Sequence, residues 1–284
     1  MINFLYSLID VVLPFEWLSF NFMKNAFLAL LLSAPLFGAL GSMVVSKRMA
    51  FFSDALGHGA FTGIAIGLVS GLLTDVVLAA VFFAVIFGVA ITLLKKRSRS
   101  SSDTVIGVFS STAAALGIAI LSLHGGVARY SHVLTGDILS ISPGQIGYLF
   151  ITFLIVGIIW LTLFNKAFLI IIDKGLAYSK ATANTAVELV FTVILAVLVA
   201  ISINWIGLLL INSFLILPAA TAKLLSRNLR QFHSLAIIIA LFCALNGLWL
   251  SYYLGIATGA AIVLLCAGCY FLALLLKSLL VKFL

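Results

Sequence analysis

The stretch Asp54-Ala-Leu-Gly-His58-Gly-Ala-Phe-Thr62-Gly-Ile-Ala-Ile-Gly67 places a carboxylate and an imidazole in a segment that is otherwise almost entirely apolar. Residues four apart lie on one face of an α-helix, so a helix here stacks Asp54, His58 and Thr62 in a column. Glycines repeat every four residues on a neighbouring face: Gly59, Gly63, Gly67 and Gly71. Such a glycine column lets another backbone come close. We therefore expect an interior helix whose polar column is turned away from lipid.

The composition around this stretch is that of a membrane protein. Of 284 residues, 64% are hydrophobic and 8% are charged, whereas a soluble domain carries about 25% charged residues. The net charge of +8 would suggest nucleic acid as a partner of a soluble protein. In a membrane protein, basic residues instead gather in cytoplasmic loops. We therefore expect the lipid bilayer, and no nucleic acid, around this chain.

Apolar stretches of about 20 residues, the length that crosses a bilayer, predict the fold class. It is an all-α integral membrane protein with about nine (eight to ten) transmembrane helices in one bundle. The predicted spans are 25–46, 54–73, 76–94, 104–123, 146–164, 185–203, 206–222, 234–253 and 257–276. Asn212 and Pro218 interrupt the span 206–222, which either crosses fully or re-enters. Residues 1–20 are expected to form a separate segment at the membrane surface.

The basic residues predict the orientation of the chain. Fourteen of the 16 follow the odd-numbered spans, and only Lys24 and Arg129 fall on the other side. Because basic loops face the cytoplasm, the amino terminus is expected outside and the carboxyl terminus inside. The outer loop 124–145 then contains His124 and His132, which either meet an incoming ion or are simply solvated.

Asp54 and His58 have two interpretations from spacing alone. A carboxylate oxygen and a neutral imidazole nitrogen are ligands for zinc and other first-row divalent ions, and a pair with vacancies suits transient capture. Alternatively, Asp54 caps a helix start, where a carboxylate complements the helix dipole. His58 then only donates to a carbonyl group. A different transport mechanism uses Asp54 and Glu188 as proton or sodium sites of a stand-alone secondary transporter.

Four blocks of sequence, in order, resemble the bacterial ABC permeases for zinc, manganese and iron ions. The first is the block Lys47–Gly67, which contains the column above. The others are Ser102-Asp-Thr-Val-Ile-Gly107, Leu134-Thr-Gly-Asp-Ile-Leu-Ser-Ile-Ser-Pro143 and Trp205-Ile-Gly-Leu-Leu-Leu-Ile-Asn-Ser-Phe-Leu-Ile-Leu-Pro-Ala-Ala-Thr-Ala-Lys-Leu224 followed by Leu225. The blocks span most of residues 40–230. The chain lacks a Gly-x-x-x-x-Gly-Lys-Ser/Thr phosphate loop, so it does not itself hydrolyse ATP by that route.

The resemblance implies the membrane-spanning permease domain, residues 21–284, of a binding-protein-dependent importer in the bacterial cytoplasmic (inner) membrane. Two copies form the path, a cytoplasmic ATPase dimer drives it, and an extracytoplasmic metal-binding protein delivers the ion. Asp54 and His58 then lie on the metal path, with no permanently bound cofactor. Zinc is slightly preferred over manganese or iron as the transported ion. The permease itself is a transport subunit and no enzyme.

The inner loop 165–184 mixes polar and apolar residues. On pattern alone it either docks on a cytoplasmic partner or rests on the inner leaflet. The resemblance implies that its residues contact the ATPase: Leu176, Ala177, Tyr178 and Ala181. Two positions depart from the family pattern. Thr62 stands where many members have Pro, which predicts a straighter helix, and Ala181 stands where a Gly is usual.

Overall fold

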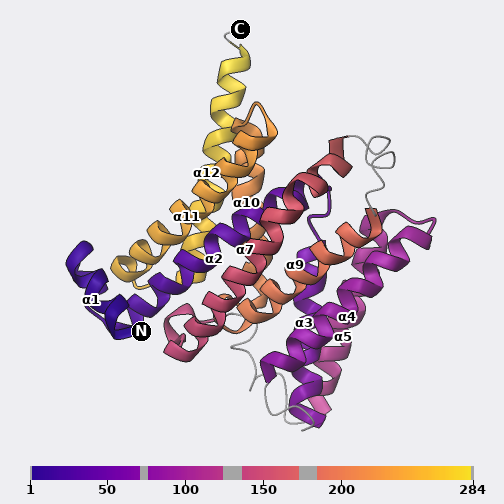
Figure 1. Ribbon diagram of the computed structural model, residues 1–284, viewed down its shortest axis with the longest axis horizontal. Helices are drawn as coiled ribbons and strands as arrows, with labels where there is room; N and C mark the ends of the chain where they lie inside the picture. Colours follow the sequence, from indigo (N-terminus) through magenta and orange to yellow (C-terminus); the bar gives the residue numbers. More distant parts are fainter. Residues whose placement is uncertain (1, 71–75, 124–135, 173–183, 283–284) are drawn as a thin grey trace. The chain divides into compact units, whose positions relative to one another are not determined.

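The computed structural model describes residues 2–70, 76–123, 136–172 and 184–282 (Figure 1). These residues form helices and no strand, which confirms the predicted all-α class. The α-helices are α1 (Ile2–Val12), α2 (Asn21–Ser46), α3 (Phe52–Ser70), α4 (Val76–Arg97), α5 (Ser102–Leu123), α7 (Pro143–Ile172), α9 (Asn184–Ile206), α10 (Leu208–Leu225), α11 (Leu229–Leu254) and α12 (Thr258–Lys282). Two short 3-10 turns are η1 (Glu16–Leu18) and η3 (Ile138–Ser140).

Eight helices in the described part of the chain are long and apolar enough to cross a membrane, which lies within the predicted range. The predicted span 206–222 corresponds to α10, whose apolar part Leu210–Leu225 is shorter than those eight. It is separated from α9 by Gly207, which has a φ of +90°, a conformation that is open to glycine and strained for other residues. The orientation of the termini stays a prediction.

The helix α7 is longer at both ends than the predicted span 146–164. It begins at Pro143 because the two residues around its first turn exchange hydrogen bonds: the backbone N–H of Ser142 donates to Gln145 Oε1 at 2.8 Å, and the backbone N–H of Gln145 donates to Ser142 Oγ at 3.4 Å. This reciprocal cap starts a helix. At its other end α7 continues to Ile172, so the first part of the predicted loop 165–184 is helical. The predicted ATPase contacts, residues 176–178 and 181, lie outside the described residues.

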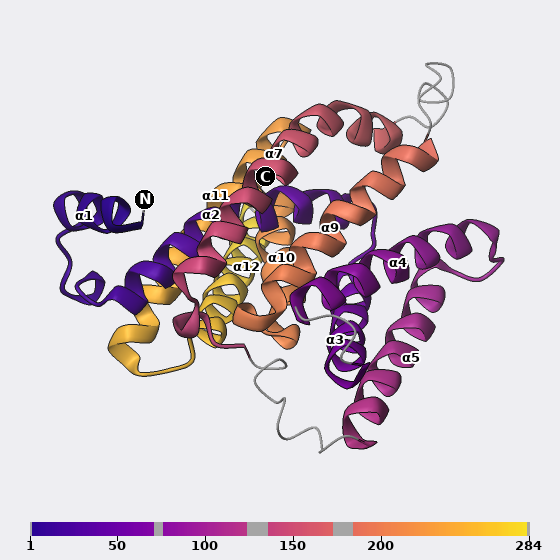
Figure 2. The same ribbon diagram turned by 60° about the horizontal axis from the view of Figure 1, so that its bottom comes forward.

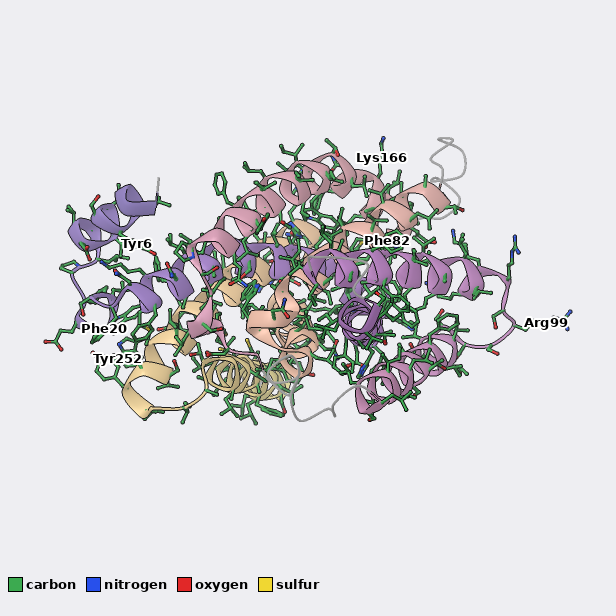
Figure 3. The ribbon with its side chains drawn as sticks, turned by 90° about the horizontal axis from the view of Figure 1, so that it is seen from below. Tyr6, Phe20, Phe82, Arg99, Lys166 and Tyr252 are labelled. Atoms are coloured by element: carbon green, nitrogen blue, oxygen red, sulfur yellow. The ribbon has the colours of Figure 1, made fainter. Side chains whose placement is uncertain are left out.

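The chain divides into two compact units. The first comprises Met1–Ser42, Asp137–Ile155 and Ser213–Leu284, and the second comprises Met43–Gly136 and Val156–Asn212. In the first unit, α1 is joined to the start of α2 by an ion pair of 2.7 Å between Asp10 and Lys24. The surface position predicted for residues 1–20 stays a prediction. At the periphery of this unit the rings of Phe20 and Tyr252, labelled in Figure 3, lie 6.3 Å apart.

Close backbone contacts hold the first unit together. In α2, a Cβ added at Gly38 would lie 2.6 Å from the carbonyl oxygen of Ala236 in α11. The helix α11 begins with Asn228 as its cap, which accepts a hydrogen bond from the N–H of Gln231 at 2.8 Å. It ends at Gly255, whose left-handed φ of +64° is typical of a helix terminus.

The second unit is built around α3, which lies beside α4, α5 and α9 (Figures 1 and 2). Its apolar side chains Phe52, Leu56, Phe61 and Ile64 are each 1% exposed or less. On the glycine face, a Cβ added at Gly63 would lie 2.7 Å from the carbonyl oxygen of Ala79 in α4. The structure therefore confirms the interior helix and the close approach that the glycine column predicts.

The substitution Gly63→Ala tests this packing against Gly107→Ala in α5. A methyl group at residue 63 meets backbone, whereas one at residue 107 has no heavy atom within 4 Å. Overpacking costs about 1–3 kcal/mol, while Gly to Ala in a free helix interior gains about 0.5–1 kcal/mol. We therefore expect Gly63→Ala to lower the melting temperature in detergent and Gly107→Ala to keep or raise it. Equal shifts would contradict the close contact of α3 with α4.

Candidate functional site

Asp54 and His58 lie on the first two turns of α3 with their polar atoms turned toward each other. The distance from Asp54 Oδ2 to His58 Nε2 is 3.7 Å, and the side chains are 35% and 24% exposed. This separation is longer than a hydrogen bond, so Asp54 Oδ2 and His58 Nε2 are not hydrogen-bonded to each other. Two ligands of one tetrahedral zinc ion lie about 3.4 Å apart. The pair is therefore spaced close to a metal-binding geometry without being locked in a contact of its own.

Two polar side chains attach this column to α5. The hydroxyl of Ser110 donates a hydrogen bond of 3.1 Å to Asp54 Oδ2. One turn below His58, the hydroxyl of Thr62 lies 2.6 Å from the carbonyl oxygen of Ala113 and 2.9 Å from that of His58. The helix α3 runs without a break through Thr62, as expected where Pro is absent. Sequence reasoning missed Ser110, although the run Ser110-Ser-Thr112 inside an apolar span was a usable signal.

The imidazole of His58 is only partly held. Its Nδ1 is buried and has no hydrogen-bond partner among the described residues. A histidine in a permanent metal site usually donates its second ring N–H to a carboxylate or carbonyl, which fixes the ring. The described residues also contain no cluster of three or more metal-ligating side chains. What they offer is a two-ligand pair with open positions.

The helix-cap interpretation of Asp54 is partly correct. Asp54 does lie in the first turn of α3, where a carboxylate complements the dipole. Within the described residues, however, the hydrogen bond that its carboxylate accepts comes from Ser110 of another helix. The position of Asp54 at the helix start is therefore compatible with its carboxylate also binding groups outside α3.

Glu188, the second acid of the secondary-transporter alternative, is held by two lysines. Its carboxylate lies 2.8 Å from Lys96 Nζ and 3.7 Å from Lys47 Nζ. Burial lowers the pKa of Lys47, and the attraction of Glu188 opposes that shift. A carboxylate already compensated by two ammonium groups is poorly suited to exchange a proton or a sodium ion. His124 and His132 lie outside the described residues.

The substitution Thr62→Val tests the link between α3 and α5. Valine keeps the shape but removes the hydroxyl that reaches Ala113, which should cost about 1 kcal/mol. The matched control is Thr112→Val, because Thr112 is exposed and, among the described residues, its hydroxyl bonds the carbonyl of Val108 in its own helix. Thermal unfolding in detergent should show a lower melting temperature for the first variant alone. A loss of the same size in both would contradict the interhelical bond.

Comparison with known proteins identifies the group to which this architecture belongs. The sequence model of the ABC 3 transport family matches residues 19–277. The manganese transport system membrane protein MntC of Listeria monocytogenes is 29% identical over 259 residues, which are 91% of each chain. The high-affinity zinc uptake system membrane protein ZnuB of Haemophilus influenzae is 27% identical over 245 residues, covering 86% of this chain and 92% of that one.

A solved structure, PsaBC from Streptococcus pneumoniae in complex with Fab, matches in three dimensions. The TM-score is 0.79 at 25% sequence identity, with 96% of this chain and 95% of the other covered. The family match, residues 19–277, contains seven of the eight described helices that are long and apolar enough to cross a membrane, and all but the last two residues of the eighth, Thr258–Leu279. The chain therefore belongs to the ABC 3 transport family, as a multi-pass membrane permease and a transport component rather than an enzyme.

Proposed function

We propose that this chain is the membrane-spanning subunit of an ATP-driven importer of divalent transition-metal ions, with Asp54 and His58 as transient ligands of the passing ion. The observation that carries this proposal is the open pair on α3, with Asp54 Oδ2 and His58 Nε2 separated by 3.7 Å. Membership of the ABC 3 transport family supports the ATP-driven class. The names of the relatives include manganese and zinc, so they support the class of ion and do not favour zinc over manganese.

The chemistry of the pair suits an ion that must enter and leave. A hydrated divalent ion loses water as it passes a narrow site, and Asp54 and His58 replace part of that shell with one anionic oxygen and one neutral nitrogen. Ser110 holds the carboxylate from α5. Because two ligands leave the shell incomplete, binding stays weak enough for release, as conduction requires.

The proposal includes partners that the importer needs. A separate ATPase dimer supplies energy in the cytoplasm, because the chain has no phosphate loop of its own. An extracytoplasmic binding protein delivers the ion. A second copy of this chain forms the other half of the path and brings a second open Asp54–His58 pair to it.

The variants Asp54→Asn and His58→Gln test the assignment in cells that depend on this importer. We expect each to lower uptake of radioactive manganese or zinc at least tenfold at an unchanged level of permease in the membrane. Asn keeps the size of Asp and loses only the charge, whose interaction with the helix dipole is worth about 0.3–1 kcal/mol, so a role limited to the helix start leaves uptake per molecule nearly intact in Asp54→Asn.

The control is Asp103→Asn, which changes an exposed acid in the first turn of α5 and should transport as the wild type does. Wild-type uptake by both site variants would contradict the ligand role. Purification of the wild-type chain without any ATPase would contradict the ATP-driven class and favour the secondary transporter.

A further inference from the structure

The segment 47–53, which runs from the end of α2 into the first turn of α3, is attached by its side chains to three other helices. Lys47 reaches Glu188 of α9 at 3.7 Å and lies 5.2 Å from the centre of the Phe191 ring. The sulfur of Met49 accepts a hydrogen bond of 3.3 Å from Lys95 of α4. The hydroxyl of Ser53 donates to the side-chain oxygen of Asn212 in α10. Asp54 is the next residue, so the backbone that carries it leaves an anchored segment.

The conformation of this segment is not the one that its residues prefer. Arg48 has a φ of +55°, which is uncommon and strained for residues with a side chain. Such a conformation persists where contacts on both sides fix it. Lys47 and Met49 flank Arg48 and supply two of those contacts.

Glu188, in the fifth position of α9, binds two lysines from different parts of the chain. Besides Lys47, it binds Lys96 at 2.8 Å, and Lys96 also donates to the hydroxyl of Thr185 at 2.9 Å. The side chain of Lys47 is only 9% exposed. A buried ion pair contributes little net stability, because desolvation offsets the attraction, and apolar residues of similar volume often replace such a pair without loss. Stability alone therefore gives no reason for the charges.

We propose that Lys47 and Glu188 form a positioning pair that fixes the start of α3, and with it the separation of Asp54 from His58. The inference rests on the proposed function. Metal–ligand distances are set to within about 0.2 Å, so a small change in the first turn of α3 alters the fit of the ion. The pair acts through Asp54 and touches no ion itself.

The double variant Lys47→Met/Glu188→Met tests whether the pair positions the start of α3 or only stabilises the fold. Methionine has a similar volume and fills irregular space, so the melting temperature should stay within a few degrees of the wild type. Uptake of manganese and zinc, per permease molecule in the membrane, should fall at least fivefold. The ratio of the manganese uptake rate to the zinc uptake rate should also change. A merely structural defect would lower both rates by the same factor.

The matched control is Arg99→Met/Asp103→Met, which also removes one cation and one anion. Both residues are exposed at the turn between α4 and α5, and Arg99 projects away from the helices there (Figure 3). This control should transport as the wild type does. Wild-type rates and ratio in Lys47→Met/Glu188→Met would overturn the positioning role.

Single variants decide the question if the double variant does not accumulate. Lys47→Arg keeps the charge and the reach, and should retain wild-type uptake per molecule. Glu188→Gln keeps the shape and loses the charge, and should lose uptake. Equal uptake in these two variants would also overturn the proposal. The positioning role and the proposed function can fail separately. If Asp54→Asn abolishes uptake while Lys47→Met/Glu188→Met transports as the wild type does, the positioning role is wrong and the proposed function stands.

Discussion

The cost of a charged group in an apolar membrane is the constraint on which this structure depends. Such a group needs a partner or access to water. Among the described residues, Lys24 has Asp10 at 2.7 Å, and Glu188 has two lysines. Asp54 has only a hydroxyl at 3.1 Å and an imidazole at 3.7 Å. Of these acids, Asp54 is the least compensated within the described residues, and this observation supports the proposal that it binds a passing cation.

Close helix packing places Asp54 and His58 on a helix that is surrounded by other helices. Because Gly63 brings α3 against the backbone of α4, α3 is an interior helix of the second unit, with Thr62 buried and Asp54 and His58 partly exposed. Ser110 and Thr62 then connect the column to α5. The segment 47–53 connects the start of α3 to α9, α4 and α10. The positions of Asp54 and His58 are thus set by contacts with four helices.

Hydropathy and spacing were enough to predict the helices and the polar column, because both are local properties of the sequence. The column follows from the spacing of four between Asp54 and His58, and eight of the predicted spans match helices of membrane-crossing length. The ends of α7 could not be predicted from hydropathy, since a side-chain cap at Ser142 and Gln145 starts it early. The short α10 follows from the backbone of Gly207.

The surroundings of the site could not be read from spacing, because they come from distant parts of the chain. Ser110 lies 56 residues from Asp54 along the sequence, and the partners of Lys47 are on α9. The sequence alone offers Glu188 as a proton or sodium site of a secondary transporter. In the structure it is the centre of an ion pair with Lys47 and Lys96.

X-ray absorption at the zinc edge, on the purified transporter loaded with Zn²⁺, tests the central claim most directly. For the wild type we expect a first shell of oxygen and nitrogen ligands, with the outer-shell scattering of an imidazole ring. In His58→Gln we expect the imidazole signal to be lost. An identical spectrum for the wild type and His58→Gln would contradict the assignment of the metal path to this column.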